Sequence, residues 1–180
     1  MTSDLATKAI ISLACRNHSD EVKWFTLFHR DVEGAEASFE LFERLRLPPN
    51  PANNGMMMYH ASCFVCAVRR AGRLLKLPSE RRTRFCEPVA RAVKLEWKKR
   101  HAYFESFKRP RDAIEHIDEK ARDHSKWAFF NFHGDRFDVD GVASVTINQG
   151  SLETLRSCRD SIARDIVQAY SDPILDLLHA

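Results

Sequence analysis

A short basic segment past the middle of the chain holds residue types that could act on a phosphodiester. Arg111 and His116 stand in the arrangement R-x4-H, and Asp112 directly follows the arginine. Arginine is a permanently charged, forked donor that can stabilise negative charge on a phosphoryl oxygen. Histidine titrates near neutral pH and can move a proton to or from a ribose oxygen. On a helix Asp112 and His116 would share a face, so the carboxylate could fix the tautomer of the imidazole.

The same residues also have a purely structural interpretation. Glu115 lies four positions after Arg111 and could hold it in a salt bridge along the helix. His116 could be an exposed histidine that pairs with Asp112 or Glu119. On a helix Arg111 and His116 would lie about 140° apart. A catalytic pair therefore needs either the full reach of the arginine or two chains that pool their residues across a dimer.

Positive charge is concentrated in one part of the sequence. The net charge is only +3, but residues 69–111 hold 15 Lys and Arg against 4 Asp and Glu, and the remainder is net acidic. Clustered cations attract the phosphates of nucleic acids and release their counterions. The alternative is a solvated helix face that neutralises acidic helices elsewhere. The candidate nucleic-acid-binding residues are Arg91, Lys94, Lys98, Lys99, Arg100, Lys108 and Arg109.

The cysteines and the other histidines do not indicate a metal site or a disulfide framework. The 5 cysteines are an odd number, and the apolar run over 9–15 is too short for a secretory signal. We therefore expect free thiols and a cytoplasmic location. His60, Cys63 and Cys66 recur every three residues, but no second Cys/His pair follows at a ligand spacing, which favours buried thiols. The sequence thus predicts no metal and no cofactor.

Apolar residues that recur at steps of three and four predict a mainly helical chain. The first expected helix covers 19–45, with Ser19 or Asp20 as its cap. A second helix is expected over 57–75, after a loop rich in proline. Each of these two helices contains one glycine. A close approach between helices would explain both glycines, and a tolerated defect is the alternative.

Prolines define the next two expected helices. The third runs from Ser79 to about Phe107, and Pro88 either kinks it or marks its true start. A shorter fourth helix begins near Pro110, in its first turn. Aromatic residues lie between the cations of the third helix, and their helical spacing favours the core over base-stacking platforms. These residues are Trp97, Tyr103 and Phe104.

The pattern changes over residues 127–147. Stretches with a period of two are separated by the turn dipeptides Gly134-Asp135 and Asp140-Gly141, which predicts a β-hairpin or a three-stranded meander. A last helix begins near Gly150. The predicted fold is a single all-α domain over residues 1–180, an antiparallel bundle of about five helices with this β insertion before the last helix.

Composition and missing motifs argue against several functional classes. The 6 glycines include no G-x-G or G-x4-G spacing, so the Rossmann and Walker fingerprints are missing. No stretch of 18 apolar residues occurs, so we expect no membrane span and no membrane partner. The sequence also lacks the G-x-S-x-G and H-E-x-x-H motifs of serine hydrolases and zincins.

The segment around Arg111 resembles the HEPN superfamily of helical-bundle proteins. The motif of that family is Arg-x4-6-His with a polar residue after the arginine, and Arg111, Asp112 and His116 match it at the shortest spacing. The motif lies at the start of a late helix that follows a long basic one, as in the family. Residues 115–118, Glu-His-Ile-Asp, look like the end of the motif in many bacterial members. The likeness in sequence covers only residues 109–119.

This resemblance implies a metal-independent endoribonuclease, usually a homodimer, with Arg111 and His116 as the catalytic pair in a composite cleft and Asp112 beside them. The ribose 2′-OH would attack its own phosphate and leave a cyclic phosphate. Such proteins often act as toxins or in phage defence, which would add an antitoxin or another protein to RNA as a partner. Other HEPN-like bundles are non-catalytic RNA-binding or interaction modules, and that alternative stays open. A small-molecule or metal-dependent bundle enzyme is a third hypothesis.

Overall fold

A helical bundle with a small sheet at one end forms the described part of the chain. The computed structural model describes residues 2–47, 50–76, 85–116, 130–139, 141 and 143–170. Its α-helices are α1 Thr2–Cys15, α2 Ser19–Arg46, α3 Asn54–Leu75, α5 Glu87–Ser106, α6 Lys108–Glu115 and α8 Gln149–Tyr170. A 3-10 turn, Pro51–Asn53, precedes α3. The strands are β1 Phe130–His133, β2 Arg136–Val139 and β3 Ala143–Thr146.

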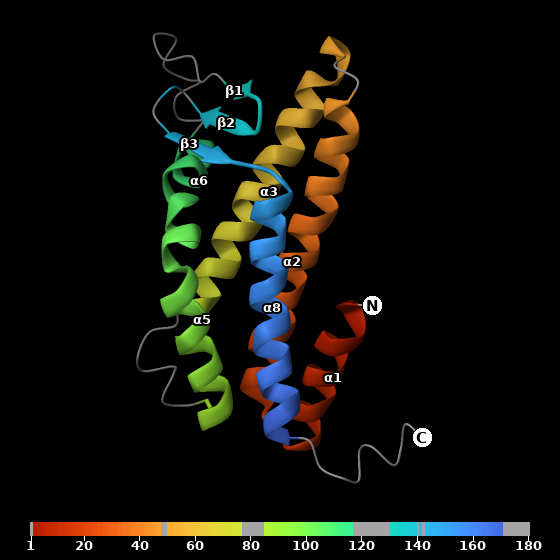
Figure 1. Cartoon of the computed structure of the whole chain (residues 1–180), viewed down its shortest axis with the longest axis vertical. Helices are drawn as coiled ribbons and strands as arrows, with labels where there is room; N and C mark the ends of the chain where they lie inside the picture. The colour runs from red at the N-terminus through yellow and green to blue at the C-terminus, as the bar shows by residue number, and fades with distance from the viewer. Residues whose placement is uncertain are drawn as a thin grey trace.

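The predicted class is confirmed, and one detail of the prediction changes. The helices α2, α3, α5 and α8 alternate in direction along the bundle (Figure 1). Within the described residues there are six α-helices rather than about five. The sheet is a three-stranded antiparallel meander before the last helix, and the described part of its first strand covers Phe130–His133. Residues 117–129, which include His124, lie outside the described part.

The first helix is the element that the sequence analysis does not include. Its buried residues Ala6, Ala9 and Leu13 pack on α8 and α2. Two of these three are alanines, so the apolar stripe is weak. The expected cap of α2 is also wrong, because Ser19 is already helical and His18 occupies the capping position without a side-chain cap bond. The turn that closes α1 leads directly into α2 and leaves no room for a longer capping segment.

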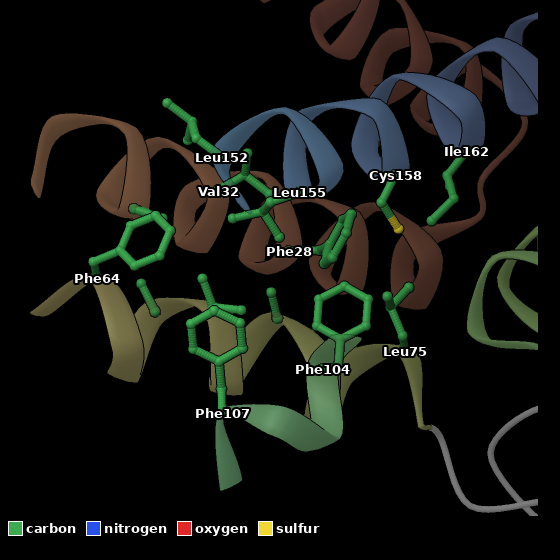
Figure 2. Close-up of a cluster of buried hydrophobic side chains, with 14 of the residues drawn as sticks. Phe28, Val32, Phe64, Leu75, Phe104, Phe107, Leu152, Leu155, Cys158 and Ile162 are labelled. Atoms are coloured by element: carbon green, nitrogen blue, oxygen red, sulfur yellow. The ribbon is translucent and has the colours of Figure 1, made fainter. Parts of the chain in front are cut away.

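Apolar side chains from four helices fill the centre of the bundle, and α2, α3 and α5 contribute phenylalanines. Figure 2 shows Phe28 of α2 beside Phe104 of α5 and Cys158 of α8, with Phe64 of α3 at the far end of the same cluster. All four are fully buried. Phe104 also stacks on Trp97 with ring centroids 6.3 Å apart. These contacts confirm that the aromatics between the cations belong to the core.

Two prolines set the starts of α5 and α6. Pro88 lies in the first turn of α5, so it marks the true start of that helix and not a kink. The residues before Phe85, including the expected cap Ser79, lie outside the described part. Pro110 is buried in the first turn of α6. The helix α6 follows α5 after a single residue, Phe107, which is buried against Phe64 at 6.0 Å.

Gly72 marks a close approach of α3 to α5. A Cβ added at Gly72 would lie 2.8 Å from the Cβ of Phe104, whereas one added at Gly34 would meet nothing within 4 Å. Only at Gly72 is the close-approach interpretation confirmed. At Gly34 the glycine occupies an exposed helix position without a packing reason.

These two glycines give opposite predictions for stability. Gly72→Ala should lower the free energy of unfolding by about 1–3 kcal/mol, because the new methyl group must displace Phe104 in a packed core. Gly34→Ala should raise it by up to about 1 kcal/mol, since alanine favours a helix over glycine. Urea unfolding followed by circular dichroism measures both. A change of the same sign in both variants would contradict the close approach.

The sheet covers the bundle beside α6. Strand β2 lies in the middle, and Phe137 pairs with Phe132 of β1 and with Val145 of β3. The glycines at the two turns adopt positive φ angles, 62° at Gly134 and 66° at Gly141, which glycine tolerates without strain. Strands β2 and β3 contact α6, so the sheet lies next to the Arg111 segment (Figure 1).

Candidate nucleic-acid interface

The helix α6 carries the candidate Arg–His pair. Arg111 lies in the middle of this helix, and His116 is the residue that caps its C-terminal end. The backbone N–H of His116 donates to the carbonyl oxygen of Asp112 at 3.2 Å. His116 is exposed, whereas Arg111 is half-buried. The bond between His116 and Asp112 places the backbone of His116 one helical turn after Asp112, and Glu119 lies outside the described residues.

Two carboxylates hold the guanidinium of Arg111. Its Nη1 donates to Oδ1 of Asp112 at 3.0 Å, and its Nη2 forms an ion pair with Glu115. The salt bridge between Arg111 and Glu115 is the contact expected if Arg111 has a purely structural role. The side chain of Arg111 is only 17% exposed. A phosphate that binds Arg111 in a single chain must therefore displace or repel these two acids.

The Cys66 thiol of α3 lies near Arg111 and Glu115, a neighbour that the sequence did not predict. Burial raises the pKa of the Cys66 thiol, and the charge of Glu115 and the neighbouring Cys63 raise it further. The guanidinium groups of Arg70 and Arg111 oppose this rise. The Cys66 thiol therefore stays protonated near neutral pH and acts as a neutral packing partner. Helical spacing alone could not reveal this neighbour, because α3 and α6 are far apart in sequence.

The remaining histidine and cysteine candidates stay dispersed. His60, Cys63 and Cys66 do not form a ligand group in the described structure. All five cysteines are free thiols. His133 is exposed, with its Nε2 3.8 Å from Oδ2 of Asp138.

Six of the seven candidate nucleic-acid-binding residues are exposed, and we name this set of residues the cation face. Its residues lie on α5 and α6, which follow one another along one side of the bundle (Figure 1). None of the six forms an ion pair with an acidic residue of the described chain. The members of the cation face are Arg91, Lys94, Lys98, Lys99, Lys108 and Arg109. These six cations therefore have no ion-pair partner among the residues that the structure describes.

Arg100 does not belong to the cation face. It is only 9% exposed, forms an ion pair with Glu96 one turn earlier, and donates from Nη2 to Ser157 Oγ of α8 at 2.9 Å. Its position on the inner side of α5 explains the difference from Lys98 and Lys99. Arg100 connects α5 to α8 and is not available to a ligand on the surface.

Acidic residues lie near the cation face at its end beside the start of α5. Arg91 lines a cavity of about 580 Å³ between α5 and α8, together with Leu95, Glu87 and Asp165. The two acids in this cavity weaken the positive potential at Arg91. Lys94 and Lys98, one turn apart, are therefore the centre of the uncompensated charge.

Comparisons with known proteins give no relative for this chain. No family model matches it, and no curated protein or solved structure matches it either. None of the helices in the described ranges is long and apolar enough to cross a lipid bilayer.

Proposed function

We propose that this protein binds RNA as a HEPN-like helical bundle, with the phosphate backbone held along the cation face. The observation that supports this best is that six exposed cations on consecutive helices have no acidic partner within the described chain. Desolvation of such groups is small, and each can replace a counterion of a nucleic acid. The row from Arg91 to Lys98 extends over about 10 Å of helix. It can therefore contact more than one phosphate of a single strand.

The proposal favours binding without base-specific contacts. Apart from Leu95 and His101, the exposed residues of α5 are charged or small. The aromatics that could stack on bases are in the core or half-buried against it. Contacts to phosphates position a nucleic acid but do not read its sequence. We therefore expect a strong dependence on salt and a weak dependence on RNA sequence.

Cleavage of the RNA is the second candidate function. Arg111 follows Lys108 and Arg109 on the same short helix, so a backbone bound to the cation face would pass the Arg–His pair. The two carboxylates on Arg111 argue against activity of an isolated chain. In a homodimer a second copy could supply a His116 or shift these acids, and the pair would then form the composite site of a metal-independent endoribonuclease. A toxin or defence role, with an antitoxin-like partner in the cytoplasm, would belong to this version.

A binding and cleavage experiment tests both versions. The full chain is mixed with a labelled single-stranded RNA in EDTA, and fluorescence anisotropy and product ends are recorded. We expect binding that weakens steeply with added salt. Cyclic-phosphate ends that disappear in Arg111→Ala and His116→Ala would establish cleavage at this pair. Binding without cleavage would establish the non-catalytic version, and a lack of RNA binding at low salt would refute the proposal.

A further inference from the structure

Three metal-ligating side chains meet at the opposite end of the bundle from the sheet. His18 lies between α1 and α2, Glu21 is in the first turn of α2, and Cys86 directly precedes α5. One ligand atom from each of the three lies within 4.8 Å of the others. They form the one group of three His, Cys, Asp or Glu side chains at such distances within the described part of the chain.

Local structure fixes the position of His18. The turn that closes α1 has the hydrogen bonds of a Schellman motif, from the N–H of His18 to the carbonyl of Leu13 at 3.1 Å and from the N–H of Asn17 to that of Ala14 at 3.1 Å. Asn17 adopts φ 59°, the left-handed conformation that this motif requires and that asparagine tolerates. His18 is therefore held at the start of α2, with Glu21 one turn further on.

The distances agree with a shared ion bound by Nδ1 of His18. Nδ1 lies 3.6 Å from Oε1 of Glu21. Two ligands of one tetrahedral zinc ion are expected about 3.4 Å apart, given bonds of about 2.1 Å to nitrogen and oxygen. The backbone N–H of Cys86 donates to the same Oε1 at 2.8 Å and brings the thiol side of the site to the carboxylate. Glu21 is only 5% exposed, and His18 is its sole ion-pair partner among the described residues.

Tyr170 of α8 supports two of the three ligands. Its hydroxyl lies 3.1 Å from Nε2 of His18 and donates to Sγ of Cys86 at 2.8 Å. A metal-bound histidine generally donates its second ring N–H to a fixed acceptor, which sets its tautomer and orientation. The Tyr170 hydroxyl is such an acceptor for Nε2–H, and it leaves Nδ1 directed at Glu21. A His18 that donates Nε2–H to Tyr170 has its Nδ1 lone pair available for a metal ion beside Glu21.

From this arrangement we propose a zinc site formed by His18 Nδ1, Glu21 and Cys86 Sγ. Imidazole, carboxylate and thiolate are the three ligand types that zinc takes in proteins. The residues line a cavity of about 360 Å³ that also includes Phe85 and Asn17, so a water molecule can reach the fourth position. The ion would connect the α1–α2 corner to the start of α5. This proposal does not depend on the binding of RNA.

Metal titration of the full chain tests the site. Protein freed of metal with a chelator is titrated with Co²⁺, and then with Zn²⁺ in competition. We expect one Co²⁺ per chain, a thiolate-to-cobalt charge-transfer absorption in the near ultraviolet, and displacement by Zn²⁺. Cys86→Ser should abolish this absorption, and His18→Gln should weaken binding at least tenfold. Tyr170→Phe should weaken it about 10- to 100-fold, as expected for a group that orients a ligand.

Cys63→Ser is the matched control, because it removes a partly buried thiol on another helix. It should leave the cobalt spectrum and the affinity unchanged. Circular dichroism of each metal-free variant shows whether it is folded, so a loss of binding can be separated from a loss of structure. No saturable binding of Co²⁺ or Zn²⁺ by folded protein would overturn the proposal. Binding that survives both Cys86→Ser and His18→Gln would overturn it equally.

Discussion

Charge reversal at the centre of the cation face is expected to weaken RNA binding by about 10- to 100-fold at physiological salt. The variant carries Lys94→Glu and Lys98→Glu, two exposed residues without an ion pair in the described chain. Each lost phosphate contact reduces the salt slope for single strands by about 0.7, so the slope should fall by about 1.4. Fluorescence anisotropy across a salt series measures affinity and slope together.

The control for this variant lies on another face of the bundle. Lys23 and Arg30 of α2 are also exposed and unpaired within the described structure. Lys23→Glu with Arg30→Glu changes the net charge of the chain by the same amount. We expect it to reduce affinity by no more than a few-fold, through long-range electrostatics that salt screens. Equal losses in the two double variants would mean that net charge, and not the cation face, determines binding.

Removal of Glu36 should destabilise the fold much more than removal of its partner Arg159. Arg159 is only 2% exposed, and its Nη1 donates to Oε1 of Glu36 at 3.0 Å. Without Glu36 its charge is left with Asp160 alone, and Nη2 already has no partner in the described structure. An uncompensated buried charge is strongly unfavourable. We expect Glu36→Ala to lower the free energy of unfolding by about 3 kcal/mol.

The reverse substitution has a different outcome. In Arg159→Met, Glu36 keeps its ion pair with Arg156 at 3.0 Å, and the new side chain fills the apolar space between the helices. Its free energy of unfolding should change by no more than about 1 kcal/mol, since apolar side chains replace buried ions well. Urea unfolding of both single variants and the double variant gives the coupling energy. If the double variant is as unstable as Glu36→Ala, the buried charge is not the cause.

Strong apolar periodicity made most of the bundle predictable. The phenylalanines of α2 and the branched side chains of α8 recur at helical steps, and the prolines give the starts of α5 and α6. The two turn dipeptides predicted a β-hairpin or a three-stranded meander, and the structure has the meander. The helix α1 was missed because small alanines form most of its buried stripe. A helix of 14 residues is marginal by itself, and the contacts with α8 and α2 that stabilise it cannot be seen in the sequence.

The residues of the candidate sites were also predictable only in part. Exposed cations on one helix can be recognised from charge and spacing, but the inward turn of Arg100 depends on Glu96 and Ser157. The group at the α1–α2 corner gave no signal, because Cys86 is 65 residues from Glu21 in the chain. Only the folded arrangement brings these side chains together. Residue types identify candidate chemistry, whereas tertiary packing decides which candidates meet.

Lysine footprinting tests the central claim most directly. The full chain is treated with an amine-acylating reagent, with and without a saturating single-stranded RNA, and modification is measured by mass spectrometry. The cation-face proposal predicts protection of Lys94, Lys98, Lys99 and Lys108, while Lys23 on α2 keeps its reactivity. Protection of Lys23 with unchanged reactivity of Lys94 and Lys98 would contradict it.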